Sequence, residues 1–161
     1  MESTLKIILA VTVALLMGCT PAVKQKAAVK DQPQQKIKEK KKMEVKQLNK
    51  EEFKKYIIDY EQHPDKWVFE GNKPAVIDFY ATWCGPCKAT APVVEAMAQK
   101  YDGKIDFYKV DVDEQEELAG LFGVQSIPTL VFIPQQGDPV KEVGAMNQSM
   151  LEGEIKQLLL K

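Results

Sequence analysis

Hydrophobic side chains recur along this chain with two different spacings, and the spacing predicts where helices and strands lie. In residues 53–60, large apolar side chains return every three or four positions, as on one face of a helix. Asn49 followed by Glu52 is a capping-box pattern at the start of that helix. The patterns predict strands over 43–48, 74–80, 105–110, 130–133 and 140–143, and helices over 50–61, 84–100, 114–122 and 147–160.

The order of these elements predicts an α/β fold. Strands and helices alternate up to residue 133, and a turn over 135–138 then joins the last two strands as a hairpin. Alternation of this kind favours a central mixed β-sheet with helices on both faces. In the connection 62–73 we expect Trp67 and Phe69 to cover one side of the core, while a partner-docking role for this segment stays open as an alternative.

One acidic residue interrupts the most apolar strand. Residues 74–80 are apolar on both faces, which is typical of a buried strand, yet Asp78 lies among them. A carboxylate in such a strand is costly unless it is paired or functional, and burial raises its pKa. The plainer interpretation is an aspartate at the end of the strand that is hydrogen-bonded or wet.

The beginning of the chain reads as an export signal. Ile7 to Met17 is almost wholly apolar and follows Lys6, but it is shorter than the roughly 20 apolar residues that span a bilayer. Leu16-Met17-Gly18-Cys19 resembles a bacterial lipobox, which implies a signal peptide over 1–18 and lipidation of Cys19. An ordinary cleaved signal or an uncleaved short anchor are the alternatives.

Charge divides the remainder of the chain into two parts. Residues 20–42 contain eight lysines, two acidic residues and no aromatic residue, a net charge of +6. A segment of this composition buries too little apolar surface to offset the entropy of ordering, so we predict a lipid-anchored, flexible tether over 19–42. Residues 43–161 then carry −7, because the whole chain carries −1 and the first 19 residues carry 0. The balance shows no bias toward nucleic acid.

Two cysteines lie where a strand is predicted to give way to a helix. Cys84 is placed at or just before the helix N-terminus, where the helix dipole and unpaired N–H groups favour an anion. A thiolate there has a lowered pKa and is the reactive form of cysteine. Pro86 suits the first helical turn, and Cys87 follows one turn on. The pair therefore predicts a dithiol that exchanges disulfides.

The residues around this pair resemble the thioredoxin family. The hexapeptide WCGPCK (83–88) follows a strand carrying Asp78, and the resemblance continues through Lys109, the stretch 126–129 and the stretch 143–145. It implies a thioredoxin domain over 43–161, with Cys84 as nucleophile and Cys87 as resolving cysteine. It also implies that Asp78 exchanges a proton with Cys87 and that Lys109 lies beside Asp78. A solvent-facing Lys109 is the alternative.

The same resemblance implies a substrate groove. Pro128 is expected to form a cis peptide bond against the cysteine pair, and Ile127 to offer its backbone to an extended substrate chain. No cofactor is implied beyond the cysteine pair. The residues expected around the substrate are Trp83, Gly85, Pro86, Ile127, Pro128 and Gly144.

Together these features predict a protein-disulfide reductase of the bacterial cell envelope, anchored to a lipid membrane through Cys19 and facing the periplasm. Its partners would be disulfide-containing exported proteins and a membrane or envelope electron donor, and we expect a monomer. Thr20 after Cys19 is not acidic, which favours the outer over the inner membrane.

Three other functions use the same residues. A thiol oxidase or disulfide isomerase would use the same cysteine pair, although Gly85-Pro86 resembles the dipeptide of reducing thioredoxins. A metal-binding module could use the two thiolates for zinc, but a second CxxC or a histidine pair is absent from the sequence. A non-catalytic adaptor would not require both cysteines and Asp78.

Overall fold

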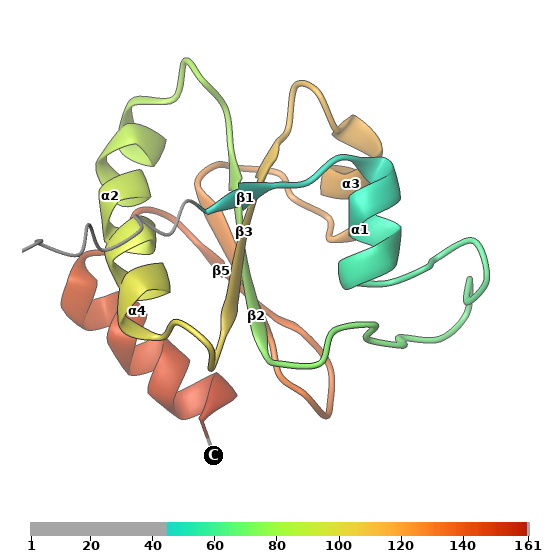
Figure 1. Ribbon diagram of the computed structural model, residues 1–161. Coiled ribbons are helices and arrows are strands. Elements are labelled where there is room, and N and C mark those ends of the chain that lie inside the picture. The colour runs from blue at the N-terminus through green and yellow to red at the C-terminus, as the bar shows by residue number, and fades with distance from the viewer. Residues whose placement is uncertain (1–44, 161) are drawn as a thin grey trace, which may run out of the picture. The chain divides into compact units, whose positions relative to one another are not determined.

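The computed structural model describes residues 45–160 (Figure 1). The predicted signal peptide 1–18, the lipidation site Cys19 and the tether 19–42 lie outside these residues. Within residues 45–160, no helix is long and apolar enough to cross a membrane. The elements of this part are β1 (Lys46–Gln47), α1 (Lys50–Tyr56), β2 (Ala75–Tyr80), α2 (Gly85–Lys100), β3 (Asp106–Asp111), α3 (Glu116–Leu121), β4 (Thr129–Ile133), β5 (Val140–Val143), α4 (Gln148–Glu154) and a π-helical turn, η1 (Ile155–Leu159).

The strands form one mixed sheet, as the sequence predicts, and their order in it is β1-β3-β2-β4-β5. β1 and β2 both pair with β3 in parallel, whereas β4 is antiparallel to β2 and to β5. Helices α2 and α4 lie on one side of the sheet, and α1 and α3 on the other (Figure 1). The carboxyl ends of the parallel strands β2 and β3 consequently meet at one edge, where the predicted active site begins.

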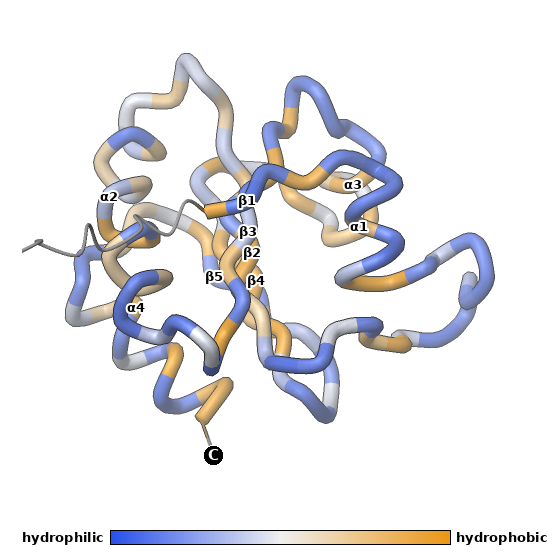
Figure 2. Tube along the Cα trace, in the orientation of Figure 1, coloured by the Kyte–Doolittle hydropathy of each residue, from blue (hydrophilic) through white to orange (hydrophobic). Residues whose placement is uncertain are grey.

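Each face of the sheet has its own hydrophobic core, and this explains the apolar run in β2. Val76 packs with residues of α2 and α4, while Ile77 and Phe79 pack with residues of α1 and α3. In Figure 2 the hydrophobic colour accordingly follows the strands through the middle of the domain. Trp67 and Phe69 pack against the second core, the one on the α1 and α3 side of the sheet, which confirms the expectation for the 62–73 connection.

The first helix ends earlier than predicted, at Tyr56 rather than at residue 61. Ile57 and Ile58 are both buried, and the Ile57 carbonyl accepts a hydrogen bond from the Glu70 N–H at 3.0 Å. This bond closes residues 57–70 into a loop whose two ends lie side by side. The helix stops because burial of two successive isoleucines outweighs the helical periodicity. The capping box of Asn49 and Glu52 is present as predicted.

Two other elements differ from their predicted form. The first strand is only two residues long and contacts the sheet through β3 alone. The last helix changes from α to π geometry after Glu154, and Ile155 and Leu159 of the π turn are both buried in the core. Sequence periodicity does not separate an α-helix from a short π turn, since both place apolar side chains on one face.

Candidate active site

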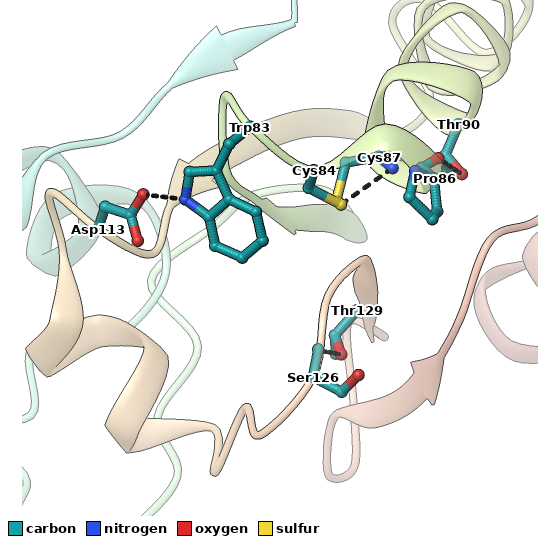
Figure 3. Close-up of a disulfide and its surroundings, with 8 residues drawn as sticks. All are labelled: Trp83, Cys84, Pro86, Cys87, Thr90, Asp113, Ser126 and Thr129. Atoms are coloured by element: carbon teal, nitrogen blue, oxygen red, sulfur yellow. Dashed lines mark hydrogen bonds between the residues drawn. A yellow bond between two sulfur atoms is a disulfide. The ribbon is translucent and has the colours of Figure 1, made fainter.

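Cys84 occupies the N-cap of α2, as the sequence predicts. Its backbone is extended (φ −76°, ψ 111°), and its Sγ accepts a hydrogen bond from the Cys87 N–H at 3.1 Å (Figure 3). Pro86 lies in the first turn, where a missing N–H removes no helical bond. The sulfur therefore takes the place of a capping oxygen and faces the positive end of a 16-residue helix.

The two cysteines form a disulfide in the structure, with sulfurs 2.02 Å apart and Cα atoms 5.3 Å apart. Both side chains are buried, Cys84 being 4% exposed and Cys87 2% exposed. They pack with Ala81, and Tyr80 and Ile127 lie against this small cluster. Ile127 is therefore a neighbour of the disulfide although it lies 40 residues after Cys87 in the chain.

Asp78 lies in the middle of β2 and is 4% exposed, so it is not a wet residue at the strand end. Its partner in the parallel register is Lys109 of β3. Burial raises the pKa of Asp78 to about 7, and the positive charge of Lys109 opposes that rise. Its Oδ1 has no hydrogen-bond partner among the described residues.

A cavity joins Asp78 to the second cysteine. It has a volume of about 300 Å³, and its lining includes Asp78, Lys109, Cys87 and Lys88. Such a volume accommodates several water molecules, since one occupies about 30 Å³ in the liquid. The geometry therefore supplies a route by which a proton can pass between the carboxyl of Asp78 and the thiol of Cys87.

The Ile127–Pro128 peptide bond is cis, as expected. The Pro128 carbonyl accepts the Gly144 N–H at 2.8 Å, which places Gly144 beside this loop with φ +112°, a conformation that favours glycine. The Thr129 hydroxyl donates to the Ser126 carbonyl at 2.6 Å. Figure 3 shows Ser126 and Thr129 across from the cysteine pair. The loop that carries Ile127 is thus held facing the disulfide.

Two acidic residues at this site were missed by sequence reasoning. Trp83 is 68% exposed, and its Nε1–H donates to Asp113 Oδ2 at 2.7 Å (Figure 3). The Asp113 N–H in turn donates to Oδ1 of the buried Asp111 at 3.0 Å. Their position in the sequence could have revealed them. Both lie at the carboxyl end of β3, which is parallel to β2, and the cysteines follow β2 at the same edge of the sheet.

Of the predicted site residues, the structure brings Asp78, Lys109 and Cys87 together around one cavity, and Ile127 against the cysteine pair. Gly85 and Pro86 are exposed at the start of α2. Within residues 45–160, no group of three or more His, Cys, Asp or Glu side chains is placed to hold a metal ion.

Comparison with known proteins agrees with this geometry. The Thioredoxin family model matches residues 44–157. Thioredoxin from Borreliella burgdorferi is 45% identical over 109 residues, covering 68% of this chain and 92% of that protein. Thioredoxin from Malassezia sympodialis is 44% identical over 102 residues, covering 63% of this chain and 94% of that protein.

Solved structures show the same fold. The crystal structure of the Malassezia sympodialis thioredoxin has a TM-score of 0.57 and 37% identity, covering 71% of this chain and 90% of that chain. Chloroplastic thioredoxin z has a TM-score of 0.60 and 26% identity, covering 72% of this chain and 95% of that chain. The chain therefore belongs to the thioredoxin family and is a thiol–disulfide oxidoreductase with Cys84 and Cys87 as its close disulfide pair.

Proposed function

We propose that this protein is a lipid-anchored reductase of the bacterial cell envelope, which transfers electrons from Cys84 and Cys87 to disulfides in exported proteins. The observation that carries the chemistry is the position of Cys84 Sγ at the N-cap of α2, where a thiolate is stabilised. The reducing direction is supported by the Gly85-Pro86 dipeptide between the cysteines.

The reaction has two displacement steps. The Cys84 thiolate attacks one sulfur of the substrate disulfide; that disulfide breaks, a mixed disulfide forms, and the departing substrate thiolate takes up a proton. Cys87 then gives its proton to the Asp78 carboxylate, and its thiolate attacks Cys84 Sγ. The second substrate thiolate leaves, so the substrate gains two electrons and the Cys84–Cys87 disulfide forms.

Asp78 suits the role of proton acceptor on two counts. It shares the cavity with Cys87, so the proton need travel only through that space. A pKa of about 7 leaves both the acid and the carboxylate populated near neutral pH, which is the condition for efficient general acid–base catalysis. Lys109 keeps the pKa from rising further, because its charge favours the carboxylate.

The envelope location is supported by the sequence. An apolar run ends in Leu16-Met17-Gly18-Cys19, and the basic segment 20–42 separates Cys19 from the folded domain. Lipidation of Cys19 would hold the domain at a membrane facing the periplasm, and the neutral Thr20 favours the outer membrane. A membrane or envelope electron donor would return two electrons to the cysteine pair after each turnover, and the protein would work as a monomer.

Trapping substrates in cells tests this function. The full chain carrying Cys87→Ser can form the mixed disulfide but cannot resolve it. We expect covalent adducts with exported proteins after acid quench, thiol alkylation and non-reducing electrophoresis. The double variant Cys84→Ser/Cys87→Ser is the matched control and should form none. Absence of adducts in the single variant would refute the two-step scheme, and adducts with non-exported proteins alone would refute the envelope location.

The reduction potential of the pair tests the direction of exchange. A value of about −270 mV, as in reducing thioredoxins, supports the reductase, whereas about −120 mV would indicate an oxidase. The redox state in intact cells gives the second readout, because a reductase with a working electron donor is found mostly in the dithiol form.

A further inference from the structure

We propose that Lys141 is a positioning residue for protein substrates, which fixes the loop carrying Ile127 without contacting the cysteines. Lys141 lies on β5, and its Nζ donates to two backbone carbonyls, Phe122 O at 2.9 Å and Gly123 O at 2.8 Å. This role rests on the proposed function, since it concerns how a protein disulfide docks beside Cys84.

The two carbonyls that Lys141 binds lie where α3 ends: Phe122 is the C-cap of the helix, and Gly123 is the residue after it. At the C-terminus of α3 the Gly123 N–H donates to Gly120 O at 3.0 Å and the Val124 N–H to Ala119 O at 2.9 Å. With φ +56° at Gly123, these bonds form a Schellman motif, which satisfies two of the last carbonyls of the helix. The two bonds use the carbonyls of Ala119 and Gly120, and they leave the Phe122 carbonyl at the C-cap to another donor.

Lys141 fits this place by charge as well as by geometry. Carbonyls at a helix C-terminus carry partial negative charge, and a lysine ammonium has three donors and a full positive charge. Hydrogen bonds from a charged donor are stronger than those between neutral groups. One side chain from β5 thus anchors the point at which the chain leaves α3.

The far end of the same loop is also held by β5 and the residue after it. Four residues after Gly123 comes Ile127, and the next carbonyl, that of Pro128, accepts the Gly144 N–H at 2.8 Å. The loop 123–128 is therefore attached at its start through Lys141 and at its end through Gly144. Ile127, which packs against the cysteine cluster, lies between the two attachment points.

Loss of one attachment should lower the fraction of molecules whose loop is ready to bind. An extended protein substrate needs the Ile127 backbone in place, so its apparent affinity falls in proportion to that fraction. A small disulfide reacts at Cys84 without the loop and should be insensitive to the change. Loss of the Lys141 ammonium is therefore expected to weaken the reaction with protein disulfides and to leave the reaction with small disulfides unchanged. A general effect on folding or on the thiols would change both reactions.

The test compares Lys141→Met with Lys141→Arg in single-turnover reduction. The reduced full chain is mixed with increasing insulin, as a protein disulfide, or with 5,5′-dithiobis(2-nitrobenzoate), as a small one. For Lys141→Met we expect the half-saturating insulin concentration to rise about threefold to tenfold, with the maximal rate and the small-disulfide rate unchanged. Lys141→Arg retains a cationic donor and should stay close to the unmodified protein.

Lys104→Met is the matched control, because it also replaces an exposed lysine by methionine but far from the active site. Lys104 lies beyond the C-terminal end of α2, whereas Cys84 caps the N-terminal end of that helix. Amide hydrogen exchange of residues 124–127 should accelerate in Lys141→Met alone. Unchanged insulin kinetics in Lys141→Met, or equal slowing with both disulfides, would overturn the proposal. Failure of the unmodified protein to reduce insulin would overturn the proposed function instead.

Discussion

The Asp78 carboxyl lies opposite Lys109 in the parallel register of β2 and β3, and both line the cavity that reaches Cys87. Burial raises the pKa of Asp78 to about 7, and Lys109 limits that rise. A raised pKa means that the charged carboxylate of Asp78 is less stable in the fold than in water. Keeping this residue therefore lowers the stability of the protein, and the proposed catalytic role of Asp78 would explain why it is present.

Replacement of Asp78 by asparagine should stabilise the fold above neutral pH. The pKa is about 7 in the fold against a reference value of 3.8, so the folded state binds the extra proton between these values. The contribution of Asp78 to the free energy of unfolding therefore falls as pH rises from about 4 to about 7 and then levels off. Asparagine has no charge to bury, and its advantage should grow over this window to as much as about 4 kcal/mol.

Urea unfolding of both oxidised proteins at about pH 5 and about pH 8 measures this advantage. The same variant should slow release of substrate from the mixed disulfide, because Cys87 loses its proton acceptor. An equal difference in unfolding free energy at the two pH values would contradict the burial argument.

Lys109→Met should move the pH dependence of the resolving step upward. Removal of the positive charge leaves burial unopposed, so the pKa of Asp78 rises above about 7 and less carboxylate is present at neutral pH. A pH profile of mixed-disulfide resolution detects the shift. Lys109→Arg retains the charge and serves as control; identical midpoints in all three proteins would show that Lys109 does not act on Asp78.

Asp113→Ala should weaken protein-disulfide reduction by releasing the exposed Trp83 ring. The change removes one hydrogen bond, from Trp83 Nε1–H to Asp113 Oδ2, and we expect a rate loss of about twofold to tenfold. Asp113→Asn retains an acceptor oxygen and should lose less. The Trp83 indole N–H resonance, assigned with Trp67→Phe, should shift in the alanine variant; an unchanged resonance and rate would contradict this role.

Two glycine substitutions should have opposite effects on stability. A Cβ added at Gly71 would overlap the ring of Phe69, which packs against the second core, so Gly71→Ala should cost about 1–2 kcal/mol. A Cβ at Gly120 meets nothing within 4 Å, and alanine there favours α3 by about 0.5–1 kcal/mol. Thermal unfolding ranks the two variants, and the reverse order would show that the Phe69 ring moves aside freely.

Cys19→Ala should abolish incorporation of radiolabelled fatty acid by the full chain in a bacterial host. The lipobox resemblance makes the Cys19 sulfur the acceptor of the lipid, and alanine has no sulfur to modify. Cys84→Ala is the control and should be labelled as fully as the unmodified protein. Equal labelling of Cys19→Ala would exclude Cys19 as the lipid-bearing residue.

The sequence by itself determined the fold class and the chemistry of this protein. Local signals carried both: the apolar run of β2 shows burial on two faces, and WCGPCK after a strand places Cys84 at a helix N-terminus. Asp78 was recognisable because a carboxylate within that run requires a reason. These inferences depend on neighbours in sequence, so no knowledge of distant contacts was needed.

Tertiary structure decided the relationships between residues far apart in the chain. The pairing of Trp83 with Asp113 and the hold of Lys141 on Phe122 each join different elements, and no periodicity reports such contacts. The early end of α1 at Tyr56 is of the same kind, because burial of Ile57 against the core outweighs local helix preference. Where packing competes with local propensity, the packed core decides, since it buries more apolar surface than one helical turn can.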